Sequence, residues 1–174
     1  HDATPVILLD PDGDLDGLSG NTYSAPAPAI TFQGTLDADS TLTAVDGVAT
    51  YAPAGELEIA AGATLDAASE VTVAAELGGE AQITVAGSLV LDGADLADTE
   101  ILVSPGGTLT LTDCTFAEGR VQFEPGSSGS LDGCGGDDDS WSLDIASDAV
   151  TVTDCQDLWE VSVSAAASIT ASTF

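Results

Sequence analysis

Apolar and polar residues alternate along most of this chain in strings of two to four residues. Gly, Ser, Pro or Asp bounds each string, and Thr or Ser fills many of the polar positions. Alternation with a period of two is typical of short β-strands that bury one face, and Thr suits strands better than helices. The pattern therefore predicts an all-β protein, with strands at Leu57–Ile59, Ile83–Val85, Leu89–Leu91, Leu109–Leu111, Val150–Val152 and Val161–Val163.

The strings repeat at a nearly constant interval. One series has intervals of 18, 20, 22 and 18 residues, counted at Val85, Val103, Phe123, Ile145 and Val163. A second series follows after a short turn at intervals of 20, 20, 21 and 17 residues, counted at Leu91, Leu111, Leu131, Val152 and Ile169. Three positions later come small residues, at Ala94, Cys114, Cys134, Cys155 and Ser172. Because the series keep their offset, the chain is predicted to coil as a solenoid.

A repeat near 20 residues with short strands and small turns resembles the right-handed parallel β-helix of the pectate-lyase-like superfamily. The segments that match this coil pattern best are 107–116 (GTLTLTDCTF) and 149–155 (AVTVTDC). The resemblance covers residues 57–174. It concerns the coil pattern and does not extend to that superfamily's catalytic residues. The resemblance implies a right-handed parallel β-helix of about six coils, on the order of 30 Å long at a coil spacing of ~4.8 Å.

The extent of the repeat divides the chain into two parts. Residues 1–40 have no clear repeat and form a less regular N-terminal segment that contains the apolar string Val6–Leu9. This string is a candidate strand for covering the first coil or for joining a second subunit. Residues 41–174 form the predicted β-helix, and Ile169–Phe174 still follows its pattern. An uncovered coil has unpaired strand edges, which favour pairing with another molecule.

The charge balance restricts the partners. Thirty acidic residues accompany Arg120 and no Lys, which gives a net charge of −29, while 44% hydrophobic residues are enough for a core. Nucleic acid and anionic membrane surfaces are excluded as direct partners, because both are bound through Lys and Arg. No apolar run is long enough for membrane insertion. Salt and bound cations reduce the self-repulsion of such a chain, so we expect an extracellular or cell-surface location.

Two acidic clusters are candidate metal sites, and Ca²⁺ is the expected ion. The first has alternating carboxylates that resemble the first half of an EF-hand or dockerin loop, at Asp10, Asp12, Asp14 and Asp16. Tyr23 occupies the twelfth position counted from Asp12, where a bidentate acid is needed, so only a partial or irregular site is predicted. The second cluster lies in a turn between coils, at Asp137, Asp138 and Asp139. Solvated acidic turns are the alternative interpretation of both.

The second cluster also raises the alternative of a carbohydrate-binding or polysaccharide-degrading β-helix. Polygalacturonase-like hydrolases use paired Asp residues as acid and base, and pectate-lyase-like elimination needs a basic proton acceptor. Those enzymes surround the anionic sugar with basic residues, whereas this chain offers only Arg120 and His1. We therefore assign no catalytic residue and expect a protein that is not an enzyme.

Three other features each have two interpretations. Cys114, Cys134 and Cys155 recur at intervals of 20 and 21 residues, so they are expected to stack, either with one bridged pair or as small buried fillers. Trp141 and Trp159 are either a sugar-stacking platform or a cover for the core. A row of outward hydroxyl groups resembles the Thr rows of ice-binding solenoids, or is ordinary strand chemistry, at Thr110, Thr112, Ser130, Thr151, Thr153, Ser168 and Thr170. Asp132 interrupts this row.

Together these patterns predict a structural or adhesive β-solenoid outside the cell. The sharper hypothesis is that copies stack head to tail into a filament through the last coil and the N-terminal segment. Ca²⁺ would then hold acidic surfaces together at the two Asp clusters. A polysaccharide-binding protein is the competing class of function.

Overall fold

The computed structural model describes residues 6–9, 29–67, 71–73, 81–136 and 141–173. These residues form β-strands and turns, and no helix occurs among them. No segment in this part of the chain therefore has the helical length and apolarity needed to cross a membrane. The prediction of an all-β fold is confirmed.

The strands form two parallel sheets, and each strand pairs with the strand one coil further along the chain. The first sheet contains, in order, β1 (Val6–Leu9), β2 (Ala29–Leu36), β4 (Thr50–Ile59), β7 (Ala81–Val85), β9 (Asp95–Val103), β11 (Thr115–Phe123), β14 (Trp141–Ile145) and β16 (Leu158–Val163). Beside this path lie β6 (Thr72–Val73), which pairs with β4, and β13 (Gly135–Gly136), which pairs with β11.

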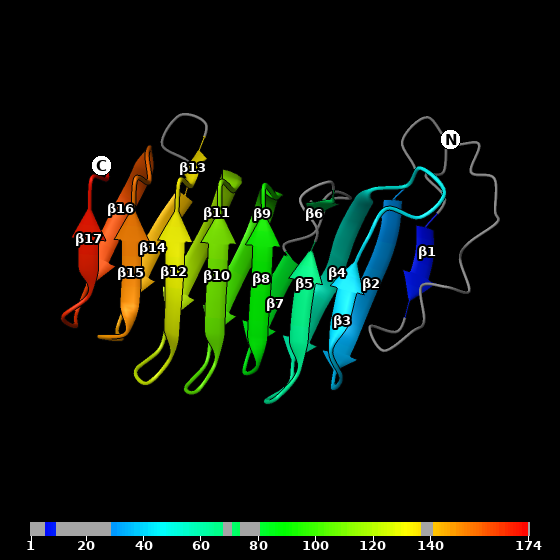
Figure 1. Cartoon of the computed structure of the whole chain (residues 1–174), viewed down its shortest axis with the longest axis horizontal. Helices are drawn as coiled ribbons and strands as arrows, with labels where there is room; N and C mark the ends of the chain where they lie inside the picture. The colour runs from blue at the N-terminus through cyan, green and yellow to red at the C-terminus, as the bar shows by residue number, and fades with distance from the viewer. Residues whose placement is uncertain (1–5, 10–28, 68–70, 74–80, 137–140, 174) are drawn as a thin grey trace.

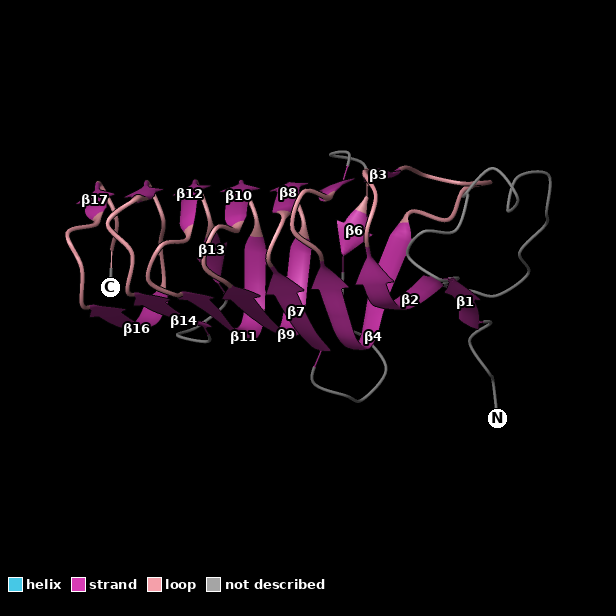
Figure 2. Ribbon diagram, turned by 90° about the horizontal axis from the view of Figure 1, so that it is seen from below, coloured by secondary structure: helices cyan, strands magenta, loops and turns pink. Residues whose placement is uncertain are grey.

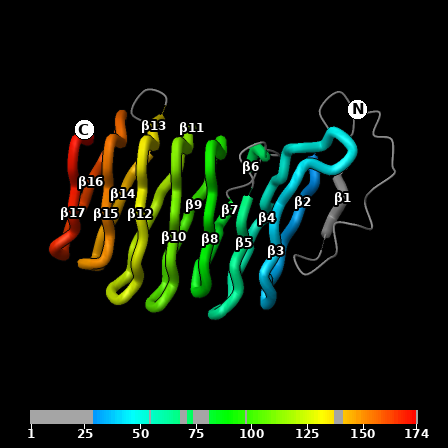
Figure 3. The backbone as a smooth tube through the Cα atoms, viewed as in Figure 1, coloured from blue at the N-terminus to red at the C-terminus, as the bar shows by residue number. Residues whose placement is uncertain are grey.

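The second sheet runs from the N-terminal to the C-terminal end of the same stack. Its strands are β3 (Ser40–Leu42), β5 (Thr64–Ala67), β8 (Ser88–Asp92), β10 (Thr108–Thr112), β12 (Ser128–Asp132), β15 (Val150–Thr153) and β17 (Ser168–Thr170). Figures 1 and 3 show the coils stacked in chain order along the long axis, and Figure 2 shows the two sheets on opposite sides. The chain is thus a parallel β-solenoid of about six turns.

Directly aligned residues on successive coils form columns, and the inward columns make the core. One column joins Leu57, Ile83, Ile101, Val121, Leu143 and Val161. Another joins Ala67, Leu91, Leu111, Leu131, Val152 and Ile169. The two repeating series of the sequence are therefore confirmed as core columns. Burying one such Leu or Val is worth roughly 1.5–3 kcal/mol, and only a neighbouring coil provides that burial.

Glycine allows the tight turns between the two sheets. Ser104–Gly107 closes with a hydrogen bond of 2.8 Å from Gly107 N to Ser104 O, and Gly106 has a φ of 86°. A left-handed φ after Pro105 is typical of a type II turn, which favours Gly at that position. A Cβ atom on Gly107 would lie 2.1 Å from Val85 O, so the neighbouring coil also excludes any side chain there.

Strand pairing extends into residues 1–40, the segment that has no clear repeat in the sequence. β2 and β3 pair in parallel with β4 and β5, and β1 pairs in parallel with β2. Val6–Leu9 therefore adds a strand to the first sheet, as its apolar composition predicts. Among the described residues, the edge strands are β1 and β16 in the first sheet and β3 and β17 in the second.

Candidate functional site

The two predicted calcium clusters, Asp10–Asp16 and Asp137–Asp139, lie outside the described residues. In the part of the chain that the structure describes, no group of three or more His, Cys, Asp or Glu side chains gathers around a common point to hold a metal ion. The Ca²⁺ assignment of the two clusters stays a prediction.

Arg120 is the only Lys or Arg in the sequence, and it lies on the outer face of the first sheet. On β11 it aligns with Glu100 of β9 and Ser142 of β14. Its guanidinium forms an ion pair with Asp144, and Nε donates a hydrogen bond of 2.8 Å to Asp144 Oδ2. That hydrogen bond raises the pKa of Arg120, and the negative charges of Asp144, Glu100 and Glu160 add to the effect. Arg120 is therefore a poor proton acceptor, contrary to what an elimination reaction would require.

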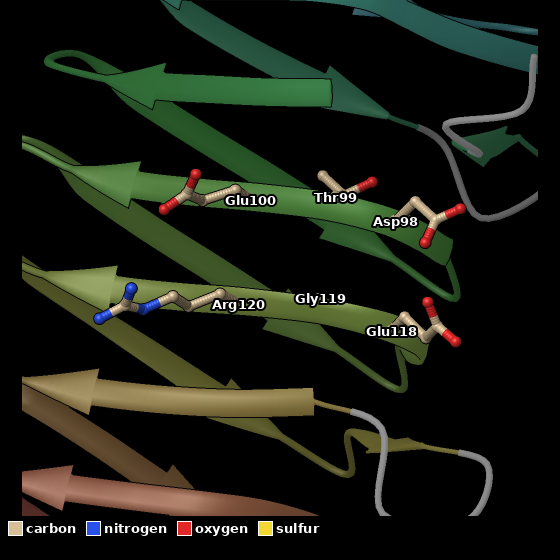
Figure 4. Close-up of a pocket in the computed structure, with 6 residues that line it drawn as sticks. All are labelled: Asp98, Thr99, Glu100, Glu118, Gly119 and Arg120. Carbon is tan, nitrogen blue, oxygen red and sulfur yellow. The ribbon is translucent and has the colours of Figure 1, made fainter. Parts of the chain in front are cut away.

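A shallow hollow of about 350 Å³ lies beside Arg120 on the same face. The residues around it come from β9 and β11, and Figure 4 shows them in two adjacent rows: Asp98, Thr99, Glu100, Glu118, Gly119 and Arg120. Asp98 and Glu118 both have a left-handed backbone, with φ of 48° and 60°, so they turn the strands at this corner. A Cβ atom on Gly119 would lie 2.8 Å from Thr99 O, and the absence of a side chain therefore keeps the two strands close.

The charge of this hollow limits what it can bind. Three carboxylates line it, and the single guanidinium is already paired with Asp144. Such a surface attracts cations and hydroxyl groups and repels anions. An anionic sugar polymer would need an additional cation to bind there.

The two tryptophans lie in different environments, so they do not form a two-aromatic platform. Trp141 is fully buried and stacks on Phe116 with ring centroids 4.4 Å apart. Trp159 is 67% exposed. The pairing of β14 with β16 shifts register between Trp141 and Ser142, which pair with Leu158 and Glu160, so Trp159 is the extra residue of a β-bulge. Bulges change the direction of a side chain, and this bulge places an aromatic ring outside the core.

The three cysteines are free and buried, which matches their interpretation as buried fillers. Their backbones stack through hydrogen bonds of 2.9 Å from Gly135 N to Cys114 O and from Gln156 N to Cys134 O. Hydrogen bonding with the Cys114 and Cys155 thiols, together with burial, raises the pKa of Cys134 far above its ordinary value. The three thiols thus form one connected column within the core.

Hydroxyl groups and acids share the outer face of the second sheet. The predicted row forms two adjacent columns. One runs from Thr110 to Ser168 and is preceded by Val90 and Asp66, and the other alternates hydroxyl groups with Asp92 and Asp132. Within the row, the hydroxyls of Thr153 and Thr170 lie 3.5 Å apart, and in a further column outside the row those of Thr108 and Ser128 lie 3.0 Å apart. The stacking of the row is confirmed, and its ice-binding interpretation stays a prediction.

The chain matches no protein-family model, and it shows no significant similarity to a curated protein or a solved structure. The fold and the surface features define it as a parallel β-solenoid with a strongly acidic exterior.

Proposed function

We propose that this chain is a non-enzymatic structural or adhesive module, outside the cell or at its surface, whose copies associate end to end. The observation that carries the proposal is the apolar surface of β16. Trp159 and Val163 are the two large hydrophobic residues that are exposed among the described residues, at 67% and 44%. Val163 is aligned with the buried Ile145 in an inward-facing column of the first sheet. The exposed side chain of Val163 is therefore an uncovered part of the core surface, which another coil can cover.

The proposed partner is a second copy, because it supplies matching strand edges. β16 and β17 are edges of the two sheets, and β1 and β3 are the opposite edges. Parallel pairing of β16 with β1 of the next copy would extend the ladder of the first sheet, whereas β3 lies one coil further into that copy. A head-to-tail contact of this kind produces a filament when its rotation does not close a ring.

Cations are part of the proposal because the charge opposes association. Each copy carries a net charge of −29. Ca²⁺ prefers carboxylate oxygens, and Asp10–Asp16 and Asp137–Asp139 are its proposed ligands. The right-handed winding and a relationship to the pectate-lyase-like superfamily also belong to this proposal, supported by the coil pattern of residues 57–174.

Sedimentation velocity and negative-stain microscopy, with millimolar CaCl₂ or with chelator, test the proposal. We expect fibres in CaCl₂, and we expect Val163→Lys to remain monomeric because a buried Lys charge opposes stacking. Val90→Lys is the matched control, since Val90 lies on the outer face of β8 in the middle of the rod and the charge change is the same.

Circular dichroism melting of both variants verifies that each remains folded. Short single rods of the wild-type protein in both solutions would contradict the proposal. Assembly of Val163→Lys at the wild-type rate would contradict the proposed interface.

The second candidate function is carbohydrate binding, which the exposed ring of Trp159 favours. Aromatic rings are strong anchors for ligands and partners when they lie exposed at a rigid position. If this function holds, the protein binds pectin-like or alginate-like polymers in affinity electrophoresis, and Trp159→Ala abolishes the retardation while Trp159→Phe preserves it. Equal retardation of all three proteins, or none at all, with and without Ca²⁺, would exclude Trp159 as a sugar platform.

A further inference from the structure

The three buried thiols repeat with the same geometry on successive coils. Each Sγ lies within hydrogen-bonding distance of the carbonyl oxygen two residues earlier, at 3.4 Å for Cys114, 3.6 Å for Cys134 and 3.4 Å for Cys155, and Cys114 Sγ also lies 3.6 Å from Leu91 O. Their backbones are also joined coil to coil by equivalent hydrogen bonds. Equal backbone positions place the three side chains in a row on coils spaced ~4.8 Å apart, with neighbouring thiols close enough to interact.

This spacing fits one kind of sulfur chemistry better than another. A disulfide needs Cβ atoms roughly 3.5–4.5 Å apart and side chains that turn toward each other. In-register side chains at ~4.8 Å point the same way, so a disulfide requires local rearrangement. Two metal–thiolate bonds of about 2.3 Å, the length known for zinc–thiolate bonds, would span about 4.6 Å with the metal midway between two sulfurs. The row therefore matches a linear sulfur–metal–sulfur unit with little movement.

We infer that the column Cys114, Cys134 and Cys155 is a binding site for a soft monovalent cation of the Cu(I) or Ag(I) class, held between adjacent thiolates. Soft thiolate ligands select such ions over Ca²⁺, Mg²⁺ and other hard ions. The first cation displaces two thiol protons. A second cation displaces the third proton and shares the central Cys134 sulfur. Two cations and three thiolates leave a net charge of −1 in the column.

The surroundings of the cysteine column are consistent with two thiolate ligands for each cation. The sulfurs lie in a row, and among the described residues no third His, Cys, Asp or Glu ligand joins any adjacent pair around one point. Zn²⁺ almost always takes four ligands in structural sites, so it is disfavoured. The acidic exterior concentrates cations near the column. One of its carboxylates, that of Asp113, lies next to Gly133, since a Cβ atom on Gly133 would be 2.3 Å from Asp113 Oδ1.

The site is limited at both ends by residues that bind no soft cation. Ala94 precedes Cys114 in the same column, with a hydrogen bond of 2.9 Å from Thr115 N to Ala94 O. Ser172 follows Cys155, and its Oγ accepts a hydrogen bond of 3.2 Å from Cys155 N. Because Ala94 already occupies this column, replacing a cysteine by alanine there should preserve the fold.

Titration of the reduced protein with AgNO₃ in chloride-free buffer, read by native mass spectrometry, tests the inference. We expect the wild-type protein to bind two Ag(I) ions. Cys114→Ala and Cys155→Ala each retain one adjacent pair and should bind one. Cys134→Ala separates the remaining sulfurs by about 9.6 Å, two coil spacings, and should bind none under conditions that saturate the end variants.

An added thiol gives the converse test. Ala94→Cys extends the row by one position and should bind three Ag(I) ions. Equal losses in all three Cys→Ala variants, or three ions bound by the wild-type protein, would show that each thiol acts alone and would overturn the inference. The affinity should also rise with pH, because the cation competes with thiol protons.

Discussion

Acidic residues provide much of the unusual backbone geometry of this chain. Of the described residues other than glycine, seven have a positive φ, and six of these are Asp or Glu: Asp46, Asp98, Asp113, Glu118, Asp154 and Asp157. Asp adopts the left-handed conformation more readily than most residues, because its short side chain can form local hydrogen bonds. At one corner of the coil, glycine and aspartate alternate, at Gly93, Asp113, Gly133 and Asp154. Part of the acidic composition therefore serves the turns of the solenoid.

A second residue-scale feature is the exchange of volume between two core columns. Gly129 stands in a column with Leu109 and Val150, where a large side chain is missing. The neighbouring column has Phe123 next to Val103 and Ile145. A Cβ atom on Gly129 would lie 2.5 Å from Leu109 O and 2.6 Å from Phe123 Cε1, so the backbone of the neighbouring coil and the Phe123 ring together occupy the space beside Gly129.

This exchange predicts a coupling between the two positions. Gly129→Ala should lower the free energy of unfolding by about 1–3 kcal/mol, because it overpacks the core. Phe123→Val removes the ring contact but not the contact with Leu109 O, so the double variant should regain part of the loss and be more stable than the sum of the two losses predicts, by at least about 0.5 kcal/mol. Urea denaturation of the wild-type protein, the two single variants and the double variant measures this double-mutant cycle. Gly129→Ala combined with Val85→Ala, two coils away, is the additive control, and additivity in both cycles would contradict the exchange.

Residue-scale packing could be predicted from the sequence only in part. The inward series Leu91, Leu111 and Leu131 identifies a core column, because strict spacing and apolar composition both indicate it. The partner of Gly129 could not be identified, since the sequence does not show which column of the other sheet faces the gap. The exposure of Trp159 could not be predicted from the sequence either, because the bulge at this residue depends on the register between β14 and β16.

At the scale of single strands, β11 protects the only Lys or Arg in the chain. The Arg120 side chain is 48% exposed, but its backbone lies within β11 and aligns with Glu100 on one side and Ser142 on the other. A protease must bind an extended, unpaired segment. Removing β11 from the stack breaks the pairing with both neighbouring coils, so cleavage there requires extensive unfolding.

Trypsin should therefore be a single-site probe of unfolding. We expect no cleavage of the native protein, and two fragments, residues 1–120 and 121–174, when urea unfolds it. The rate of cleavage should follow the unfolded fraction measured by circular dichroism. Asp148→Arg adds a site in an exposed bend and serves as the control that native protein can be cut. Rapid native cleavage at Arg120 would show that β11 opens locally.

At the scale of the whole molecule, the acidic residues are distributed so that neighbouring coils rarely place two charges together. In the strand pairing of the described residues, Asp and Glu are aligned with other residue types, except at the corner where Asp98 and Glu118 lie between the aligned pairs Ala97–Ala117 and Thr99–Gly119. One outer column alternates Asp92, Thr112, Asp132 and Thr153. Its carboxylates are therefore two coils apart, about 9.6 Å, which is close to the Debye length of about 10 Å at 0.1 M salt. The spacing lets a chain with a net charge of −29 stack its coils at moderate ionic strength.

The same spacing predicts a salt-dependent cost when it is broken. Thr112→Asp would create three aligned carboxylates at ~4.8 Å intervals, and each new neighbouring pair should cost about 1 kcal/mol at low salt. We expect the melting temperature in 10 mM salt to fall by about 4–8 °C, since 1 kcal/mol corresponds to about 2–4 °C at this size. Thr112→Asn has a similar shape without the charge, so its smaller loss should not depend on salt. In 1 M NaCl, where the Debye length is about 3 Å, the two variants should converge. A difference between them that persists at high salt would mean that side-chain packing, and not repulsion between coils, sets the spacing of the acids.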